Sequence, residues 1–227
     1  MHTPSAVLFD AYGTLFDVYS VGDTAERLFP GHGQALAALW RDKQIEYTRL
    51  VTMSGDDSRY RPFWELTVAG LRYACQRLGL QLDATREQAL LDQYRQLTPF
   101  PENREVLQQL RARGIVTGVL SNGDPAMLDA AVRSAGFDGL LDHVLSIDTV
   151  RRYKTHPDAY ALGTRATGLQ AQQVLFVSSN GWDALAATWW GYQTLWVNRR
   201  QLPFEMLDTQ PTRIGRSLAD VLSFFPG

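Results

Sequence analysis

The sequence contains only one cysteine, Cys75, among its 227 residues, so an internal disulfide cannot form. Its N-terminus also lacks the basic segment and the apolar run of a signal peptide. Both features favour a reducing compartment, and we expect a cytoplasmic protein. Cys75 lies among apolar residues at helical spacing, which predicts a buried core thiol.

Long hydrophobic runs and an excess of positive charge are missing as well. No apolar run approaches the ~18–20 residues of a membrane-spanning helix, so we expect no membrane partner. Lys and Arg total 22 against 24 Asp and Glu, a formal net charge of −2, without a basic cluster. We therefore expect no nucleic-acid partner. The four histidines show no ligand spacing, and no metal site is predicted.

Short apolar runs predict the buried strands of a parallel sheet. They span residues 6–9, 115–120, 143–147, 174–177 and 194–197. Helical stretches separate the later four, and those at 125–135 and 157–167 each begin with proline and end before glycine. The repeated strand–helix order predicts an α/β fold with a doubly wound, Rossmann-like parallel sheet.

The interval between the first two strands has a different pattern. Residues 18–97 show no strand pattern, and they contain long helical stretches at about 34–53, 60–78 and 84–97. These are too many residues for one crossover, so we expect an all-helical cap subdomain inserted after the first strand. The core domain would then comprise residues 1–17 and 98–227, with two prolines at 99 and 101 marking the return to it.

Polar and charged residues stand at the carboxyl ends of four strands, where ligands bind in open α/β sheets. They are Asp10 and Thr14, then Ser121 and Asn122, then Lys154, and finally Ser178, Asn180 and Asp183. Each one alone is as well explained by a turn or a helix cap. Together they supply a carboxylate nucleophile, hydrogen-bond donors, a cation and a second carboxylate, which predicts an active site.

This order of motifs resembles the haloacid dehalogenase superfamily. The first motif is matched by "DAYGTL" from Asp10, the second by Ser121, the third by Lys154 and the fourth by Asp183. Phosphatases of the superfamily carry a second aspartate two residues after the nucleophile and paired acids in the fourth motif to hold Mg²⁺. Here residue 12 is tyrosine and "SSNGWD" offers one acid, so both departures argue against phosphoryl transfer.

Both departures match the L-2-haloacid dehalogenase branch instead. The chain reads "FDAYGTLFDV", "WRDKQIEYTRL", "LSNGDP", "YKTHPDAY" and "VSSNGWDA", which is similar to that branch through cap and core alike. The resemblance implies that Asp10 attacks C2 of a short L-2-haloacid and forms an ester, with inversion. Water then hydrolyses the ester to the D-2-hydroxy acid, with Asp183 orienting or deprotonating it. No cofactor is implied.

The resemblance also implies roles for the remaining site residues. Arg41 and Asn122 would bind the halide ion, and Ser121 with the backbone N–H groups of Ala11 and Tyr12 would bind the substrate carboxylate. Thr14 and Tyr160 would support the nucleophile and the lysine, and Ser178 and Asn180 would lie beside the water. A small apolar pocket would be formed by Tyr12, Phe63 and Trp182. A homodimer is expected from the family and from the aromatic-rich cap.

Three other functions stay open from the sequence. One is a phosphatase of the same superfamily, which Tyr12 disfavours. Another is a hydrolase of a different activated carbon next to a carboxylate, such as a strained ring, which would use the same Asp10 ester. The third is a binding protein on this fold, although such a protein would be expected to lose part of the site set, and the set is complete here.

Overall fold

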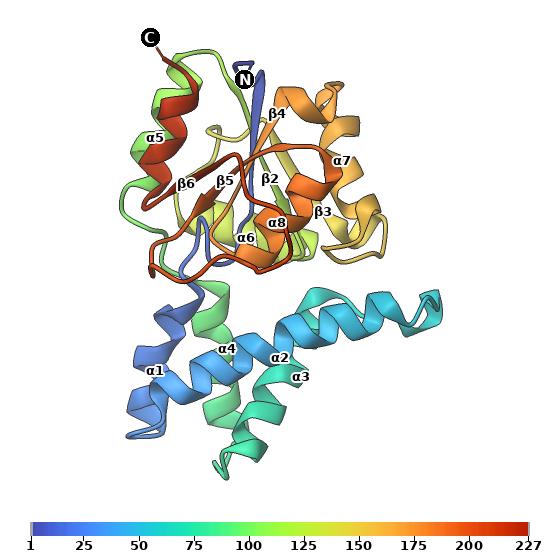
Figure 1. Ribbon diagram of the computed structural model, residues 1–227. Coiled ribbons are helices and arrows are strands. Elements are labelled where there is room, and N and C mark those ends of the chain that lie inside the picture. The colour runs from blue at the N-terminus through green and yellow to red at the C-terminus, as the bar shows by residue number, and fades with distance from the viewer. Residues whose placement is uncertain (1, 227) are drawn as a thin grey trace.

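A six-stranded parallel sheet forms the centre of the computed structural model, which describes residues 2–226 (Figure 1). Its spatial order is β3-β2-β1-β4-β5-β6. The strands are β1 (Ala6–Phe9), β2 (Val116–Ser121), β3 (His143–Ser146), β4 (Val174–Ser178), β5 (Gln193–Val197) and β6 (Arg213–Gly215). The sequence order reverses on either side of β1, so the crevice beyond the carboxyl end of β1 is where this fold binds ligands.

Helices cover both faces of the sheet, as the alternation of buried side chains on β1 requires. Val7 and Phe9 belong to the larger apolar cluster, while Leu8 belongs to a smaller one on the opposite face. The core helices are α5 (Asn103–Ala112), α6 (Pro125–Ser134), α7 (Pro157–Thr167) and α8 (Gly181–Trp190). In Figure 1, α5 and α7 flank the sheet from opposite sides. The predicted doubly wound α/β fold is confirmed.

Most predicted elements agree closely with the observed ones. The five predicted strands match β1 to β5 within one residue at each end, and α7 has the predicted bounds. The prediction missed β6, whose three residues begin with a charged arginine and lie at the sheet edge. It also gave no bounds for α5 and α8, or for the short helix α1 (Val21–Leu28).

Four helices follow β1 and lie together beyond its carboxyl end (Figure 1). Besides α1 they are α2 (Gly33–Met53), α3 (Phe63–Arg77) and α4 (Ala84–Arg95). The two chain connections to the core run side by side, since Asp17 N donates to Thr98 O at 2.8 Å. That pairing supports the proposed cap of residues 18–97, whose boundaries stay a prediction. Across residues 2–226, no helix combines the length and apolar character needed to cross a bilayer.

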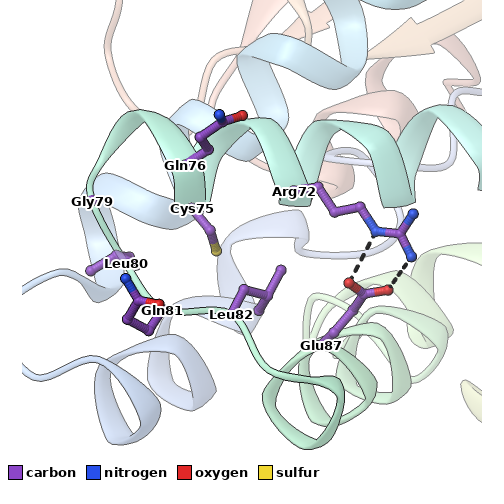
Figure 2. A pocket seen from close by; sticks show the side chains of 8 residues that line it. All are labelled: Arg72, Cys75, Gln76, Gly79, Leu80, Gln81, Leu82 and Glu87. Atoms are coloured by element: carbon purple, nitrogen blue, oxygen red, sulfur yellow. Dashed lines mark hydrogen bonds and ion pairs between the residues drawn. The ribbon is translucent and has the colours of Figure 1, made fainter.

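Cys75 lies in α3 beside a hollow of about 490 Å³ on the cap. Figure 2 shows this hollow. Arg72 and Glu87 lie at its edge, where the Arg72 guanidinium donates two hydrogen bonds of 3.0 and 2.7 Å to the Glu87 carboxylate. The thiol side chain is 1% exposed, so the predicted core cysteine is confirmed. Burial raises the pKa of the Cys75 thiol to about 11, with a smaller contribution from Glu87.

We expect the Cys75 thiol to be nearly inert in the folded protein, because only the thiolate is nucleophilic. At pH 8, labelling by a thiol-specific disulfide reagent should be slower than in guanidinium chloride by more than about 100-fold. Equal rates in both conditions would contradict the buried placement of this side chain.

Candidate active site

The loop after β1 fixes the position of Asp10. Asp10 N donates to Val177 O at 2.9 Å, which continues the pairing with β4 for one more residue. The chain then turns sharply, and Leu15 N and Phe16 N both donate to Ala11 O at 2.9 and 3.0 Å. Gly13 has φ +98° in this turn, a conformation that side chains rarely allow. The Gly-Thr pair of the motif therefore shapes the turn that presents the carboxylate.

The Asp10 carboxylate accepts hydrogen bonds from three side chains. Its Oδ2 accepts from Thr14 Oγ1 at 3.0 Å and from Asn180 Nδ2 at 2.8 Å. Its Oδ1 accepts from Lys154 Nζ at 3.1 Å. Asp10 is only 5% exposed, so these donors hold the carboxylate in a single orientation within a largely dry site.

Lys154 joins Asp10 to the second buried carboxylate. Its ammonium donates to Asp183 Oδ2 at 2.9 Å, and the Tyr160 hydroxyl donates to Asp183 Oδ1 at 2.7 Å. Burial raises the pKa of Asp183, while the Lys154 charge acts in the opposite direction. Burial and the Asp183 charge raise the pKa of Tyr160 well above its ordinary value, so its phenol stays protonated and donates. The result is a fixed chain Asp10–Lys154–Asp183–Tyr160.

The other polar residues at the strand ends hold the loops in place. Asn122 Oδ1 accepts from Lys154 N at 3.0 Å, which couples the end of β2 to the lysine segment. Ser121 Oγ accepts from Gly123 N at 3.1 Å, and Ser178 Oγ accepts from Asn180 N at 3.1 Å. These two serines are fully buried, and their hydroxyls order the turns that carry Asn122 and Asn180.

Arg41 reaches the site from the cap helix α2. Its Nη2 donates to Tyr12 O at 3.0 Å, and the same carbonyl accepts from Asn180 Nδ2 at 3.1 Å. One backbone oxygen of the nucleophile loop therefore connects the cap to the end of β4. Arg41 is 9% exposed, so its guanidinium is a nearly buried positive charge at the boundary of cap and core.

Gln44, one turn along α2, holds the Arg41 guanidinium from behind. Its Oε1 accepts from Arg41 Nη1 at 2.7 Å, and its Nε2 donates to Thr67 Oγ1 at 2.6 Å. Tyr94 OH is within 3.0 to 3.1 Å of the same amide. Gln44, Thr67 and Tyr94 were not among the predicted site residues. For Gln44, the sequence signal was its position one turn after Trp40, a polar side chain on the buried face of α2.

Aromatic rings line the cap side of the nucleophile loop. The Tyr12 ring lies 5.6 Å from that of Phe63 and 5.9 Å from that of Tyr94, centre to centre. Burial, with smaller contributions from Tyr94 and Asp124, raises the pKa of Tyr12 well above its ordinary value, so this residue is neutral. Trp182 is half-buried, and the Arg49 guanidinium of α2 lies 5.5 Å from the centre of its ring.

The structure thus brings most of the selected residues into one bonded set. Asp10, Thr14, Lys154, Tyr160, Asn180 and Asp183 are linked directly through side-chain hydrogen bonds. Arg41 and Asn122 join through backbone atoms, whereas Ser121 and Ser178 bond within their own turns. Ala11 lies buried in the loop, and Trp182 contacts Arg49 of α2.

The arrangement suits nucleophilic catalysis by a carboxylate. Asp10 is buried, oriented by three donors and in contact with the Lys154 ammonium. Asp183 is the second acid, and Lys154 separates it from Asp10. Within residues 2–226, His, Cys, Asp and Glu side chains form no group of three or more suited to holding a metal ion.

Comparison with known proteins gives consistent results. A sequence profile described as haloacid dehalogenase-like hydrolase matches residues 4–191. The (S)-2-haloacid dehalogenase of Pseudomonas sp. (strain YL) is 43% identical over 219 residues, 96% of this chain and 93% of that enzyme. A solved L-2-haloacid dehalogenase has a TM-score of 0.96 and 56% identity, covering 98% of this chain and 99% of its own. The solved L-2-haloacid dehalogenase of Xanthobacter autotrophicus with chloropropionic acid covalently bound has a TM-score of 0.89 and 35% identity. The match covers 99% of this chain and 100% of that chain.

The buried amide of Gln44 should matter for stability. We expect Gln44→Leu to lower the free energy of unfolding by ~2–4 kcal/mol, because Arg41, Thr67 and Tyr94 each lose a buried partner. Urea denaturation measures this change. The matched control is Gln88→Leu on the exposed face of α4, expected within about 0.5 kcal/mol of wild type. An equal effect of both substitutions would show that the network contributes nothing.

Proposed function

The chain belongs to the haloacid dehalogenase-like hydrolases, and from that premise we propose that it hydrolyses short L-2-haloalkanoic acids to D-2-hydroxy acids. One observation carries the choice of reaction. The Asp10 carboxylate is paired with Lys154, while residue 12, two positions on, is a buried tyrosine whose pKa is raised and which stays neutral. The site therefore has no carboxylic acid at position 12 to protonate a leaving oxygen.

The first step requires only a nucleophile and an acceptor for the departing charge. An Asp10 carboxylate oxygen attacks C2 of the substrate in line, a C–O bond forms, and the C–halogen bond breaks with its electron pair leaving on the halide. Halide leaves as a stable anion and needs no proton. The single displacement inverts C2 and leaves an Asp10 ester.

The second step is hydrolysis of that ester at the Asp10 carboxyl carbon, so C2 keeps its inverted configuration. Asp183 is our candidate to accept the proton of the attacking water, with Lys154, Ser178 and Asn180 beside it. The bond between the Asp10 carboxyl carbon and the product oxygen then breaks, and the second proton of the water passes to the product oxygen. Asp10 is again a carboxylate, and Asp183 releases its proton to solvent. Thr14 and Tyr160 support this machinery through Asp10 and Asp183.

Substrate recognition is proposed for the remaining residues of the site. Arg41 is bonded through two of its N–H groups to Tyr12 O and Gln44, and a guanidinium has five, so others are left for a halide ion. Asn122 is the second halide candidate. Ser121 and the backbone N–H groups of Ala11 and Tyr12 would bind the substrate carboxylate. The apolar side of the pocket would consist of Tyr12, Phe63 and Trp182.

Two further properties are part of the proposal. A homodimer is supported by apolar side chains on the cap surface, such as Leu50 and Met53 near the end of α2, which are 56% and 84% exposed. A cytoplasmic location is supported by the single cysteine.

The reaction can be tested by incubating the protein with L-2-chloropropionate, chloroacetate and p-nitrophenyl phosphate, with and without EDTA. We expect halide release that persists in EDTA, because Lys154 supplies the positive charge beside Asp10. Asp10→Asn should lower the rate by more than about 10³-fold, as loss of a nucleophile does. Turnover in H₂¹⁸O should place label in the Asp10 peptide.

Several outcomes would overturn this assignment. Mg²⁺-dependent phosphate release without halide release would favour the phosphatase alternative. Turnover of a strained-ring acid such as an epoxide carboxylate, without turnover of either chloroacid, would favour the other activated-carbon hydrolase. An unlabelled Asp10 peptide during active turnover would exclude the ester.

The pH dependence of kcat should report on Asp183. Burial raises the pKa of this carboxyl, so on acidification it becomes protonated before an ordinary aspartate would. Only the ionised form can accept a proton from water, and kcat should therefore fall as the pH drops through that raised pKa, at a midpoint above the usual ~4. The measurement is kcat between pH 4 and 9. If Asp183→Asn retained the same acidic limb at wild-type kcat, Asp183 would not be the group involved.

A further inference from the structure

The segment that leads into Lys154 is held by the cap. Tyr153, the residue before the lysine, is fully buried and contacts the cap through its backbone, its hydroxyl and its ring. Its backbone N donates to Thr52 Oγ1 at 3.0 Å, and its hydroxyl donates to Arg61 O at 2.6 Å. Its ring also stacks on that of Tyr60, at 5.6 Å between centres and 24° between planes.

The same segment makes further bonds to the cap. Tyr60 OH donates to Asp148 Oδ1 at 2.6 Å, and Arg152 Nη1 donates to Asp57 Oδ1 at 2.5 Å. Thr52 is in the last turn of α2, and residues 57–61 lie in the connection from α2 to α3. The cap partners are thus 88 to 101 positions away in sequence from the segment they hold. We call residues 52–61 the cap loop.

Lys154 itself is held from the core side. Its backbone N donates to Asn122 Oδ1 at 3.0 Å, and its ammonium contacts Asp10 at 3.1 Å and Asp183 at 2.9 Å. The peptide unit between Tyr153 and Lys154 therefore lies between two anchors, the cap loop on one side and the end of β2 on the other. A lysine side chain is flexible and has four carbons, so its two short contacts depend on where its backbone is fixed.

We propose that Tyr153 is a positioning residue for Lys154, and that the Thr52 hydroxyl and the Arg61 carbonyl of the cap loop act through it. The ammonium is then correctly placed between Asp10 and Asp183 only while the cap loop is docked on the core. This inference rests on the proposed function, in which Lys154 serves both steps. Cap docking and assembly of the lysine contacts become one event.

The expected loss of kcat follows from how far Lys154 would be displaced. Displacement of a catalytic group by about 1 Å can lower a rate by up to about 10²-fold. Weakening one of several anchors should displace Lys154 by less than that. We therefore expect a kcat loss of about 5- to 20-fold, with KM changed by less than about twofold, because Tyr153 has no contact with the residues proposed to bind substrate other than Phe63.

Four variants test the proposal. Tyr153→Phe removes the hydroxyl bonded to Arg61, and Thr52→Val removes the acceptor for Tyr153 N. The matched control is Thr24→Val, which removes a hydroxyl bonded to Gln93 and Arg27 between cap helices, away from the lysine segment. Thr52→Ser keeps the acceptor and should retain wild-type kcat.

The pH profile supplies a readout that loss of packing alone would not change. The groups facing Asp183 are Lys154, Asp10 and Tyr160, and of these only Lys154 carries positive charge. Because Lys154 lowers the pKa of Asp183, its displacement in Tyr153→Phe and Thr52→Val should move the acidic limb of kcat to higher pH. Thr24→Val should leave both kcat and the limb unchanged, whatever it does to the melting temperature.

The outcomes distinguish a failure of the proposed function from a failure of the inference about Tyr153. Absence of halide release by the wild-type protein would overturn the proposed function and this inference with it. An active wild-type protein whose Tyr153→Phe and Thr52→Val variants behave like Thr24→Val would overturn the inference alone. A lower kcat with an unshifted acidic limb, or a Thr52→Ser variant as slow as Thr52→Val, would also overturn it.

Discussion

The placement of one ammonium between two buried carboxylates governs the rest of the site. Lys154 Nζ contacts Asp10 and Asp183 at 3.1 and 2.9 Å, and all three side chains are almost completely shielded from water. Two carboxylates without that cation would repel each other in a medium that stabilises neither. Other polar residues donate hydrogen bonds to the carboxylate oxygens that Lys154 does not contact. Thr14 and Asn180 donate to Asp10, and Tyr160 donates to Asp183.

This constraint explains why the chain needs so many separate segments to build one site. The strand ends bring Asp10, Asn180 and Asp183 together because β1 and β4 are neighbours, and β2 adds Asn122 on the other side of β1. Lys154 comes from a long connection after β3, at the far side of β2, and so it needs support beyond the sheet. The cap supplies part of that support, and it also carries Arg41. The cap therefore contributes to the positions of both cations near the nucleophile loop.

Sequence reasoning was successful where the chemistry is local in the chain. Buried parallel strands are short continuous apolar runs, so five strands and the polar residues that follow them, such as Asp10, could be predicted. It failed where a polar residue finds its partner far away. Gln44 on a helix is read as a solvated side chain until Thr67 and Tyr94, 23 and 50 residues distant, are seen beside it. Tyr153 was missed for the same reason, since its partners Thr52 and Arg61 lie about a hundred residues earlier.

In the proposed function, residue 12 is the position that distinguishes this site from one that protonates a leaving oxygen. Its side chain packs against Phe63 and Tyr94, and its phenol is too deeply buried to ionise. Its backbone carbonyl accepts from both Arg41 and Asn180 and so holds the cap to the core at the nucleophile loop. An aspartate there would introduce a third acid beside Asp10 and Asp183, with an apolar wall around it. That charge would be costly in a site whose ammonium is already shared by two carboxylates. The apolar surroundings of Tyr12 and the single lysine thus favour the same chemistry, in which the leaving group departs as an anion and requires no proton.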